Sequence, residues 1–185
     1  MKKEKVYAGI DPGKKGALAF IRESGVTSFP TPTIGKEYDK QEMCNIIRNM
    51  NEEFDVHVVL ENINSHSAKG RQTAFVMGKG VAYWEAFLVA FNVPHTMATP
   101  QQWQKVMWEG VPKQTTTKNP SLLAPKRLFP SESFLATQRS SVPHDGLVDA
   151  VLIDEYCRRK SKGQTWNFTR STLSKDRQLI TIRSS

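Results

Sequence analysis

The stretch Tyr7–Ile21, YAGIDPGKKGALAFI, decides how this chain folds. Two apolar runs, Val6–Ile10 and Ala17–Ile21, flank the turn sequence DPGKKG, and this spacing predicts an antiparallel β-hairpin. Asp11 therefore lies at the end of a strand that the pattern predicts to be buried. A carboxylate is costly to bury unless a positive charge lies beside it. The function of the chain depends on whether other acidic residues converge on Asp11.

Composition limits the class of protein. The 185 residues suffice for one domain with a hydrophobic core, and 38% hydrophobic residues are typical of a globular chain. Twenty-six Lys and Arg against 18 Asp and Glu give a net charge of +8. This charge favours a polyanionic partner, of which nucleic acid is the commonest.

The cysteines and the apolar runs indicate where the protein resides. Cys44 and Cys157 have no metal-ligand spacing, which is typical of reduced thiols rather than of a zinc site. The N-terminal stretch MKKEKVYAGI does not resemble a signal peptide, and no apolar run reaches the roughly 18 residues of a membrane span. We therefore expect a soluble protein of the cytoplasm, without a membrane partner.

The hairpin is followed by alternating strand and helix patterns, which predict an α/β domain. Residues 1–160 form this domain, and residues 161–185 form a basic, polar tail. Asp39 and Glu42 have the spacing of a capping box at a helix start. Pro125 lies inside a helical fragment, which we expect to start late or to be broken there. The other predicted elements are strands at Gly25–Phe29, Val56–Leu60 and Pro94–Ala98, and helices at Gln72–Phe91, Gln101–Met107, Ser121–Phe129 and His144–Lys160.

Three further acidic residues stand at positions comparable to that of Asp11. Glu61 ends the predicted strand Val56–Leu60, and Asp145 and Asp149 lie four residues apart on one face of the last predicted helix. Taken singly, each acid is explained by a turn cap, an ion pair or a solvated helix face. Taken together, they predict a carboxylate cluster holding two Mg²⁺ ions, or Mn²⁺ in their place, about 4 Å apart. Such a pair of ions cleaves phosphodiesters.

Several blocks of the sequence resemble the RuvC-type Holliday-junction resolvases, particularly their phage and viral relatives. They cover Tyr7 to Arg159 and read GIDPGKKGALAFI, VVLENI, KGRQTAFVMGKGVAYWEAFLVA, TPQQWQKVM, KRLFP and VPHDGLVDAVLIDEY. The resemblance implies an RNase H-like fold with a mixed sheet covered by helices on both faces. It also implies a homodimeric, Mg²⁺-dependent endonuclease that cuts four-way and related branched DNA during recombination.

The resemblance assigns roles residue by residue. Asp11 corresponds to the first-strand aspartate of the family, Glu61 to the glutamate that ends its fourth strand, and Asp149 to the aspartate inside the last helix. The fourth ligand of the family is an Asp or His one helical turn or less before that position; Asp145 is the natural match here, with His144 beside it as the alternative. Gly146 occupies the spacing that bacterial members use, and glycine has no side chain to bind a metal.

Basic and polar residues near these motifs are candidates for DNA contacts. Lys14 and Lys15 follow Asp11 and can reach a phosphate near the metals. Four further candidates surround the start of the long predicted helix: Lys69, Arg71, Gln72 and Lys79. Lys118 is the last candidate and precedes the predicted helix Ser121–Phe129. Of the aromatic residues, Trp103 and Trp108 are expected in the core. A second set belongs either to a dimer interface or to the core: Phe75, Tyr83, Trp84 and Phe87.

Two alternative functions remain compatible with the sequence. A branched-DNA-binding protein of the same fold without catalysis would show the same basic composition, although all its acidic positions are filled here. Actin-like ATPases and sugar kinases also begin with a strand, an aspartate and a glycine-rich phosphate hairpin. They need two such domains, so this chain would be a fragment of one.

Overall fold

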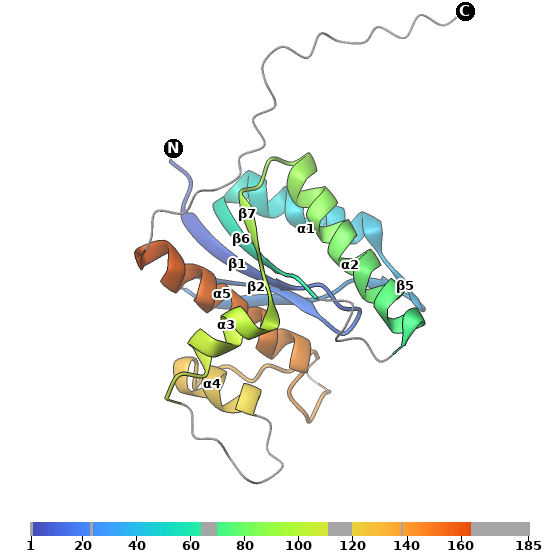
Figure 1. Cartoon of the computed structure of the whole chain (residues 1–185). Helices are drawn as coiled ribbons and strands as arrows, with labels where there is room; N and C mark the ends of the chain where they lie inside the picture. Colours follow the sequence, from blue (N-terminus) through green and yellow to red (C-terminus); the bar gives the residue numbers. More distant parts are fainter. Residues whose placement is uncertain (1, 23, 64–69, 111–119, 138, 164–185) are drawn as a thin grey trace, which may run out of the picture.

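The computed structural model describes residues 2–22, 24–63, 70–110, 120–137 and 139–163. Its centre is a five-stranded sheet in the order β3-β2-β1-β6-β7. The strands are β1 (Lys5–Asp11), β2 (Ala17–Arg22), β3 (Gly25–Pro30), β6 (Asp55–Glu61) and β7 (His95–Ala98). The predicted α/β class with a mixed sheet is confirmed (Figure 1).

The strand directions bring two of the acidic residues to one edge of the sheet. β1, β2 and β3 form an antiparallel meander, whereas β6 and β7 run parallel to β1. Ile10 of β1 pairs with Leu60 of β6, so the next residue of each strand, Asp11 and Glu61, lies at the same end. The carboxyl ends of parallel strands commonly carry functional groups.

Helices cover both faces of the sheet, as predicted (Figure 1). α1 (Lys40–Glu53) and α2 (Arg71–Ala90) enclose one core, which includes Trp84. α3 (Pro100–Met107), α4 (Pro120–Leu128) and α5 (Asp145–Gly163) enclose the other. The side chain of Asp39 caps α1 by accepting a hydrogen bond from the Glu42 amide at 3.1 Å, as its sequence pattern predicts.

Glycines set the close approach of helices to the central hairpin. A Cβ at Gly9 would overlap the α5 backbone at Asp154, 2.3 Å from its amide nitrogen. A Cβ at Gly80 of α2 would come within 2.6 Å of the Tyr38 hydroxyl oxygen, which donates to the Val76 carbonyl at 3.1 Å. Tyr38 belongs to a second, two-stranded sheet formed by β4 (Thr33–Ile34) and β5 (Glu37–Tyr38).

The second half of the chain differs from the prediction at α4. This helix starts at residue 120 and continues through Pro125 to Leu128, so the expectation of a late or broken helix is wrong. A proline at this point removes one hydrogen bond, from its own nitrogen to the carbonyl four residues earlier. Ala124 is buried in the core beside α5, and this packing holds the helix in spite of the lost bond.

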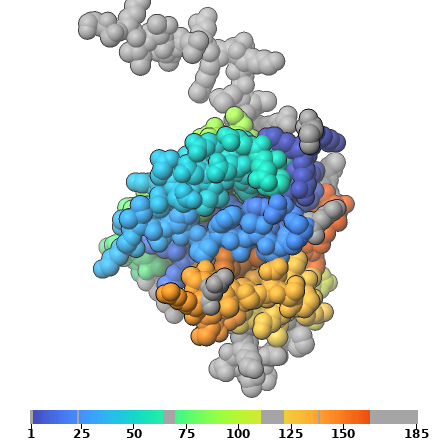
Figure 2. Space-filling model, turned by 180° about the vertical axis from the view of Figure 1, so that it is seen from behind, coloured from blue at the N-terminus to red at the C-terminus, as the bar shows by residue number. Residues whose placement is uncertain are grey.

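The last helix and the exposed edge of the sheet complete the fold. α5 continues past the predicted end at Lys160 to Gly163, and the tail from residue 164 onward lies outside the described residues. From behind, the blue band that includes edge strand β3 lies between α1 in cyan and the orange segment after α4 (Figure 2). Within the described residues, no helix combines the length and apolar character of a membrane span.

Candidate active site

Three carboxylates from three elements meet where β1, β6 and α5 come together. The charge of Asp11 raises the pKa of both Glu61 and Asp149, and Asp149 in turn raises the pKa of Glu61. No Lys or Arg of the described residues is among the groups that shift the pKa of these two acids. The structure therefore gathers negative charge around Glu61 and Asp149 without a described lysine or arginine to neutralise it.

Asp11 is held by the hairpin turn. Its Oδ1 accepts a hydrogen bond from the Gly13 amide at 3.1 Å, which fixes the carboxylate over the turn that follows β1. Burial raises the pKa of Asp11, while the Gly13 hydrogen bond and the nearby His144 lower it. Gly16 closes the same turn, with its amide 2.9 Å from the Gly13 carbonyl oxygen.

Glu61 is the most enclosed of these acids, with 8% of its surface exposed. Its Oε1 accepts a hydrogen bond from Nε1 of Trp103 at 2.8 Å. Burial, helped by the charge of Asp11, raises the pKa of Glu61 to about 8 even though the indole hydrogen bond lowers it. The carboxyl group is thus in an environment that disfavours its ionised form unless a cation is present.

Asp149 lies on the first turns of α5 among buried neighbours. Burial and the charges of Asp11 and Asp145 raise its pKa to about 7. Its Oδ1 is buried and has no hydrogen-bond donor among the described residues. A buried carboxylate oxygen without a donor is a fitting ligand for a metal ion, because the cation replaces the missing partner.

The two candidates for the fourth ligand stand at the start of α5. Asp145 is exposed in the first turn of the helix, close enough to Asp149 to influence its pKa. Nδ1 of His144 accepts a hydrogen bond from the Leu147 amide at 3.2 Å, so this imidazole caps the helix. With Nδ1 as the acceptor, the proton of the neutral imidazole is on Nε2, which can donate to a carboxylate but has no lone pair for a metal.

The acidic groups are near one another, but their side chains are not arranged around a common metal position. Within the described ranges, no three His, Cys, Asp or Glu side chains are in position to hold a metal together. The shared electrostatic effects nevertheless place Asp11, Glu61 and Asp149 in one neighbourhood.

The predicted DNA contacts fall into two groups. Lys14 and Lys79 converge on Glu37 of β5: Nζ of Lys79 is 3.2 Å from Oε2, and Nζ of Lys14 is 4.0 Å from Oε1. The Lys79 hydrogen bond is the main cause that lowers the pKa of Glu37, followed by Lys14. Lys15, Arg71 and Gln72 are exposed at the hairpin turn and the start of α2. Lys69 and Lys118 lie outside the described residues.

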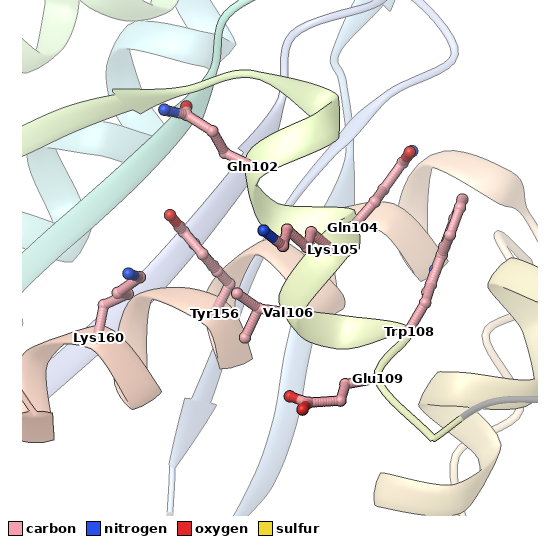
Figure 3. Close-up of a pocket in the computed structure, with 8 residues that line it drawn as sticks. All are labelled: Gln102, Gln104, Lys105, Val106, Trp108, Glu109, Tyr156 and Lys160. Atoms are coloured by element: carbon pink, nitrogen blue, oxygen red, sulfur yellow. The ribbon is translucent and has the colours of Figure 1, made fainter.

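A surface cleft lies apart from these acids. It has a volume of about 630 Å³ and lies between α3 and the second half of α5 (Figure 3). Lys105 and Trp108 line one side, and Tyr156 and Lys160 line the other. None of the four predicted metal ligands lines this cleft.

The sequence predicted Trp103 and Trp108 in the core and left the other aromatic residues open between the core and a dimer interface; Trp108 is partly buried against the core. Trp103 and Trp84 are fully buried, while Tyr83 and Phe87 pack partly buried against the core beneath α2. Phe75 differs, with 65% of its surface exposed. Two functional contacts were missed: the Trp103 hydrogen bond to Glu61 and the ion pairs of Glu37. Neither has a signal in sequence spacing, because each joins distant segments.

Comparisons with known proteins identify solved structures that share this fold. No protein-family model matches the sequence, and no curated protein sequence matches it either. Thermus thermophilus RuvC in complex with a Holliday junction substrate superposes with a TM-score of 0.50 at 18% identity, over 82% of this chain and 91% of that one. Another structure of Thermus thermophilus RuvC gives a TM-score of 0.50 at 19% identity, over 83% of this chain and 95% of that one.

A eukaryotic resolvase has the same architecture. The yeast mitochondrial Holliday junction resolvase Ydc2 superposes with a TM-score of 0.50 at 16% identity, over 86% of this chain and 80% of that one. The chain therefore has the RNase H-like fold in the form found in RuvC-type resolvases. Its likeness to the phage and viral branch stays a prediction.

Proposed function

We propose that the protein is a metal-dependent endonuclease that resolves four-way and related branched DNA. The observation that carries this proposal is the meeting of Asp11, Glu61 and Asp149 without a neutralising lysine or arginine. The RuvC-type fold and the net charge of +8 support a nucleic-acid substrate. The junction itself is inferred from what the similar structures act on.

The chemistry of the donor set fits hard divalent cations. Carboxylate oxygens are the preferred ligands of Mg²⁺ and Mn²⁺, and the donor-free Oδ1 of Asp149 is available to such an ion. Two bound Mg²⁺ ions would activate a water and stabilise the leaving oxygen of the phosphodiester. Asp11, Glu61 and Asp149 would hold them, with Asp145 as the fourth ligand. We favour Asp145 over His144 because Nδ1 of His144 already caps α5.

The protein is also proposed to act as a homodimer, which suits a substrate that must be cut in two strands. Support comes from α2, where exposed apolar residues share one helical face. Phe75 and Val89 expose 65% and 51% of their surfaces, and small residues, Gly78 and Ala82, lie between them. Such a face packs readily against a second copy of the same helix.

A cleavage assay tests the catalytic proposal. The parent protein and the variants Asp11→Asn and Glu61→Gln are incubated with a synthetic four-way junction or a matched linear duplex, in Mg²⁺, Mn²⁺ or EDTA. We expect the parent to cut the junction only with metal, and both variants to bind it without cutting, because they lose ligand charge but keep the basic surface. In the same assay, loss of activity in Asp145→Asn but not in His144→Ala supports Asp145 as the fourth ligand.

The second candidate is a branched-DNA-binding protein without catalysis. It is favoured by the finding that no three potential ligands among the described residues are already in position to hold a metal. Tight junction binding by the parent, with no cleavage in either metal, would establish this alternative. Equal cutting by Asp11→Asn and the parent would contradict the carboxylate mechanism.

A further inference from the structure

We infer that Trp103 is a positioning residue, whose indole N–H fixes the carboxylate of Glu61 in the orientation needed to bind a divalent cation. This inference rests on the proposed function, because Glu61 acts as a ligand only there. Trp103 is 42 positions from Glu61 in the sequence and belongs to another element, α3. Its side chain donates to Glu61 and, being fully buried, has no surface to offer a substrate.

The indole ring is held rigidly enough to position another group. Trp103 is fully buried, and its ring packs edge-on against Trp108 with the centroids 6.4 Å apart. α3 begins with Pro100, and a capping box stabilises its N-terminus. In this box the Thr99 amide donates to Oε1 of Gln102 at 2.8 Å. The start of this short helix is therefore fixed, and Trp103 lies in its first turn.

The backbone beside Glu61 is fixed by the same segment of the chain. The amide of Asn62 donates to the Ala98 carbonyl at 2.8 Å, which extends the pairing of β6 with β7 one residue beyond Glu61. β7 leads directly into α3. The Glu61 backbone and the indole that contacts its side chain are thus connected through a few residues of rigid structure.

The chemistry of the donor explains why a tryptophan suits this position. An indole N–H donates one hydrogen bond and carries no charge. It occupies Oε1 of Glu61 and leaves Oε2 and the full negative charge for a cation. A lysine or arginine would orient the carboxylate equally well, but it would neutralise the charge on which metal binding depends. Groups behind a metal ligand typically change metal affinity by about 10- to 100-fold when they are lost.

The chain offers a matched control. Trp108 is the neighbouring tryptophan in the same aromatic pair, but its buried Nε1 has no hydrogen-bond partner within the described residues. Trp103→Phe removes the N–H that contacts Glu61, whereas Trp108→Phe removes an N–H that contacts nothing described. Both substitutions keep an aromatic ring and cause a similar loss of ring volume.

Two measurements test the inference on the full chain. Electron paramagnetic resonance counts free Mn²⁺ during titration of the metal-free proteins, and cleavage of the four-way junction is followed against Mg²⁺ concentration. We expect Trp103→Phe to bind Mn²⁺ about 10-fold more weakly than the parent. Its half-maximal Mg²⁺ concentration should rise similarly, with most of the maximal rate recovered at saturating metal. Trp108→Phe should match the parent in both.

The outcomes separate a positioning role from a structural one. A Trp103→Phe protein with parental Mn²⁺ affinity, or one no weaker than Trp108→Phe, overturns the inference while the proposed function stands. A parent that binds no Mn²⁺ overturns the proposed function and the inference together. If Trp103→Phe does not fold, site-specific replacement of Trp103 by 3-benzothienylalanine, which keeps the shape of the ring without the N–H, makes the same comparison.

Discussion

The folded chain buries the carboxyl groups of Glu61 and Asp149, and the free-energy cost of this burial is larger when the groups are ionised. Their pKa values are about 8 and about 7, well above the ordinary values of 4.5 and 3.8. In the absence of metal, both carboxyls therefore hold protons near neutral pH that they would release in the unfolded chain. A divalent cation competes with these protons, so metal binding should strengthen as the pH rises.

This protonation predicts how the stability of the metal-free protein depends on pH. Between the ordinary pKa and the raised one, the folded state binds more protons than the unfolded state, so the free energy of unfolding decreases as pH rises. The contribution of Glu61 is retained below about pH 4.5 and is lost as the pH passes 8. Thermal unfolding in EDTA should therefore show a melting temperature that falls from pH 5 to pH 9, and Mg²⁺ should reduce this fall.

A variant isolates the contribution of Glu61 to that slope. Glu61→Gln cannot titrate, so its melting temperature should fall less steeply between pH 5 and pH 9. Asp11, Asp149 and the fully buried Asp154 contribute to the remaining slope, because burial raises the pKa of each of them as well. An identical pH profile for Glu61→Gln and the parent would show that Glu61 is ionised in the folded protein.

At the level of elements, the contact between α5 and the hairpin decides whether the acids meet. A Cβ at Gly146 would come within 2.6 Å of the Gly16 Cα. Glycine at this position lets the first turn of α5 lie directly on the hairpin turn that carries Asp11. Asp145 and Asp149, on either side of Gly146, are brought to the site by the same contact.

We predict that Gly146→Ala lowers the free energy of unfolding by about 1–3 kcal/mol, because the added methyl forces α5 away from the hairpin. Junction cleavage should fall with it, since Asp149 moves relative to Asp11. Gly78→Ala on α2 is the control: within one protomer a Cβ there meets nothing within 4 Å, so alanine should stabilise the helix by about 0.5–1 kcal/mol at protein concentrations where the chain is monomeric. Urea denaturation measures both, and a Gly146→Ala protein as stable as the parent would refute the close contact.

At the scale of the whole molecule, the excess positive charge is partly cancelled where DNA is proposed to bind. Glu37 lies between Lys14 and Lys79, which come from the hairpin turn and from α2. With 68% of its side chain exposed, Glu37 forms ion pairs that are screened and weak. A DNA phosphate can therefore displace the carboxylate and take both ammonium groups.

We predict that Glu37→Gln binds the four-way junction several-fold more tightly than the parent at low salt. For both proteins, the logarithm of the affinity should fall linearly with the logarithm of the salt concentration, because phosphate contacts release counterions. Glu52→Gln makes the same change of charge at the exposed end of α1 and should have a smaller effect. Fluorescence anisotropy at several salt concentrations measures this. Equal gains for the two variants would reduce the role of Glu37 to net charge alone.

The sequence by itself determined the features that arise from neighbouring residues. The hairpin around Asp11, the cap of Asp39 on α1 and the order of strands and helices follow from apolar periodicity and turn chemistry over a few residues. Glu61 was found in the same way, at the end of an apolar strand pattern, although its meeting with Asp11 needs the long-range parallel pairing of β1 with β6. These patterns were sufficient to select Asp11, Glu61 and Asp149 as a candidate site.

The tertiary structure alone decided the contacts between distant segments. The hydrogen bond from Trp103 to Glu61 and the ion pairs of Glu37 each join two segments that are far apart in the chain. No periodicity in the sequence relates these residues. The continuity of α4 through Pro125 has the same origin, since burial of Ala124 beside α5 outweighs a local preference. Local rules describe the chain one segment at a time, whereas these features depend on the free energy of packing several segments together.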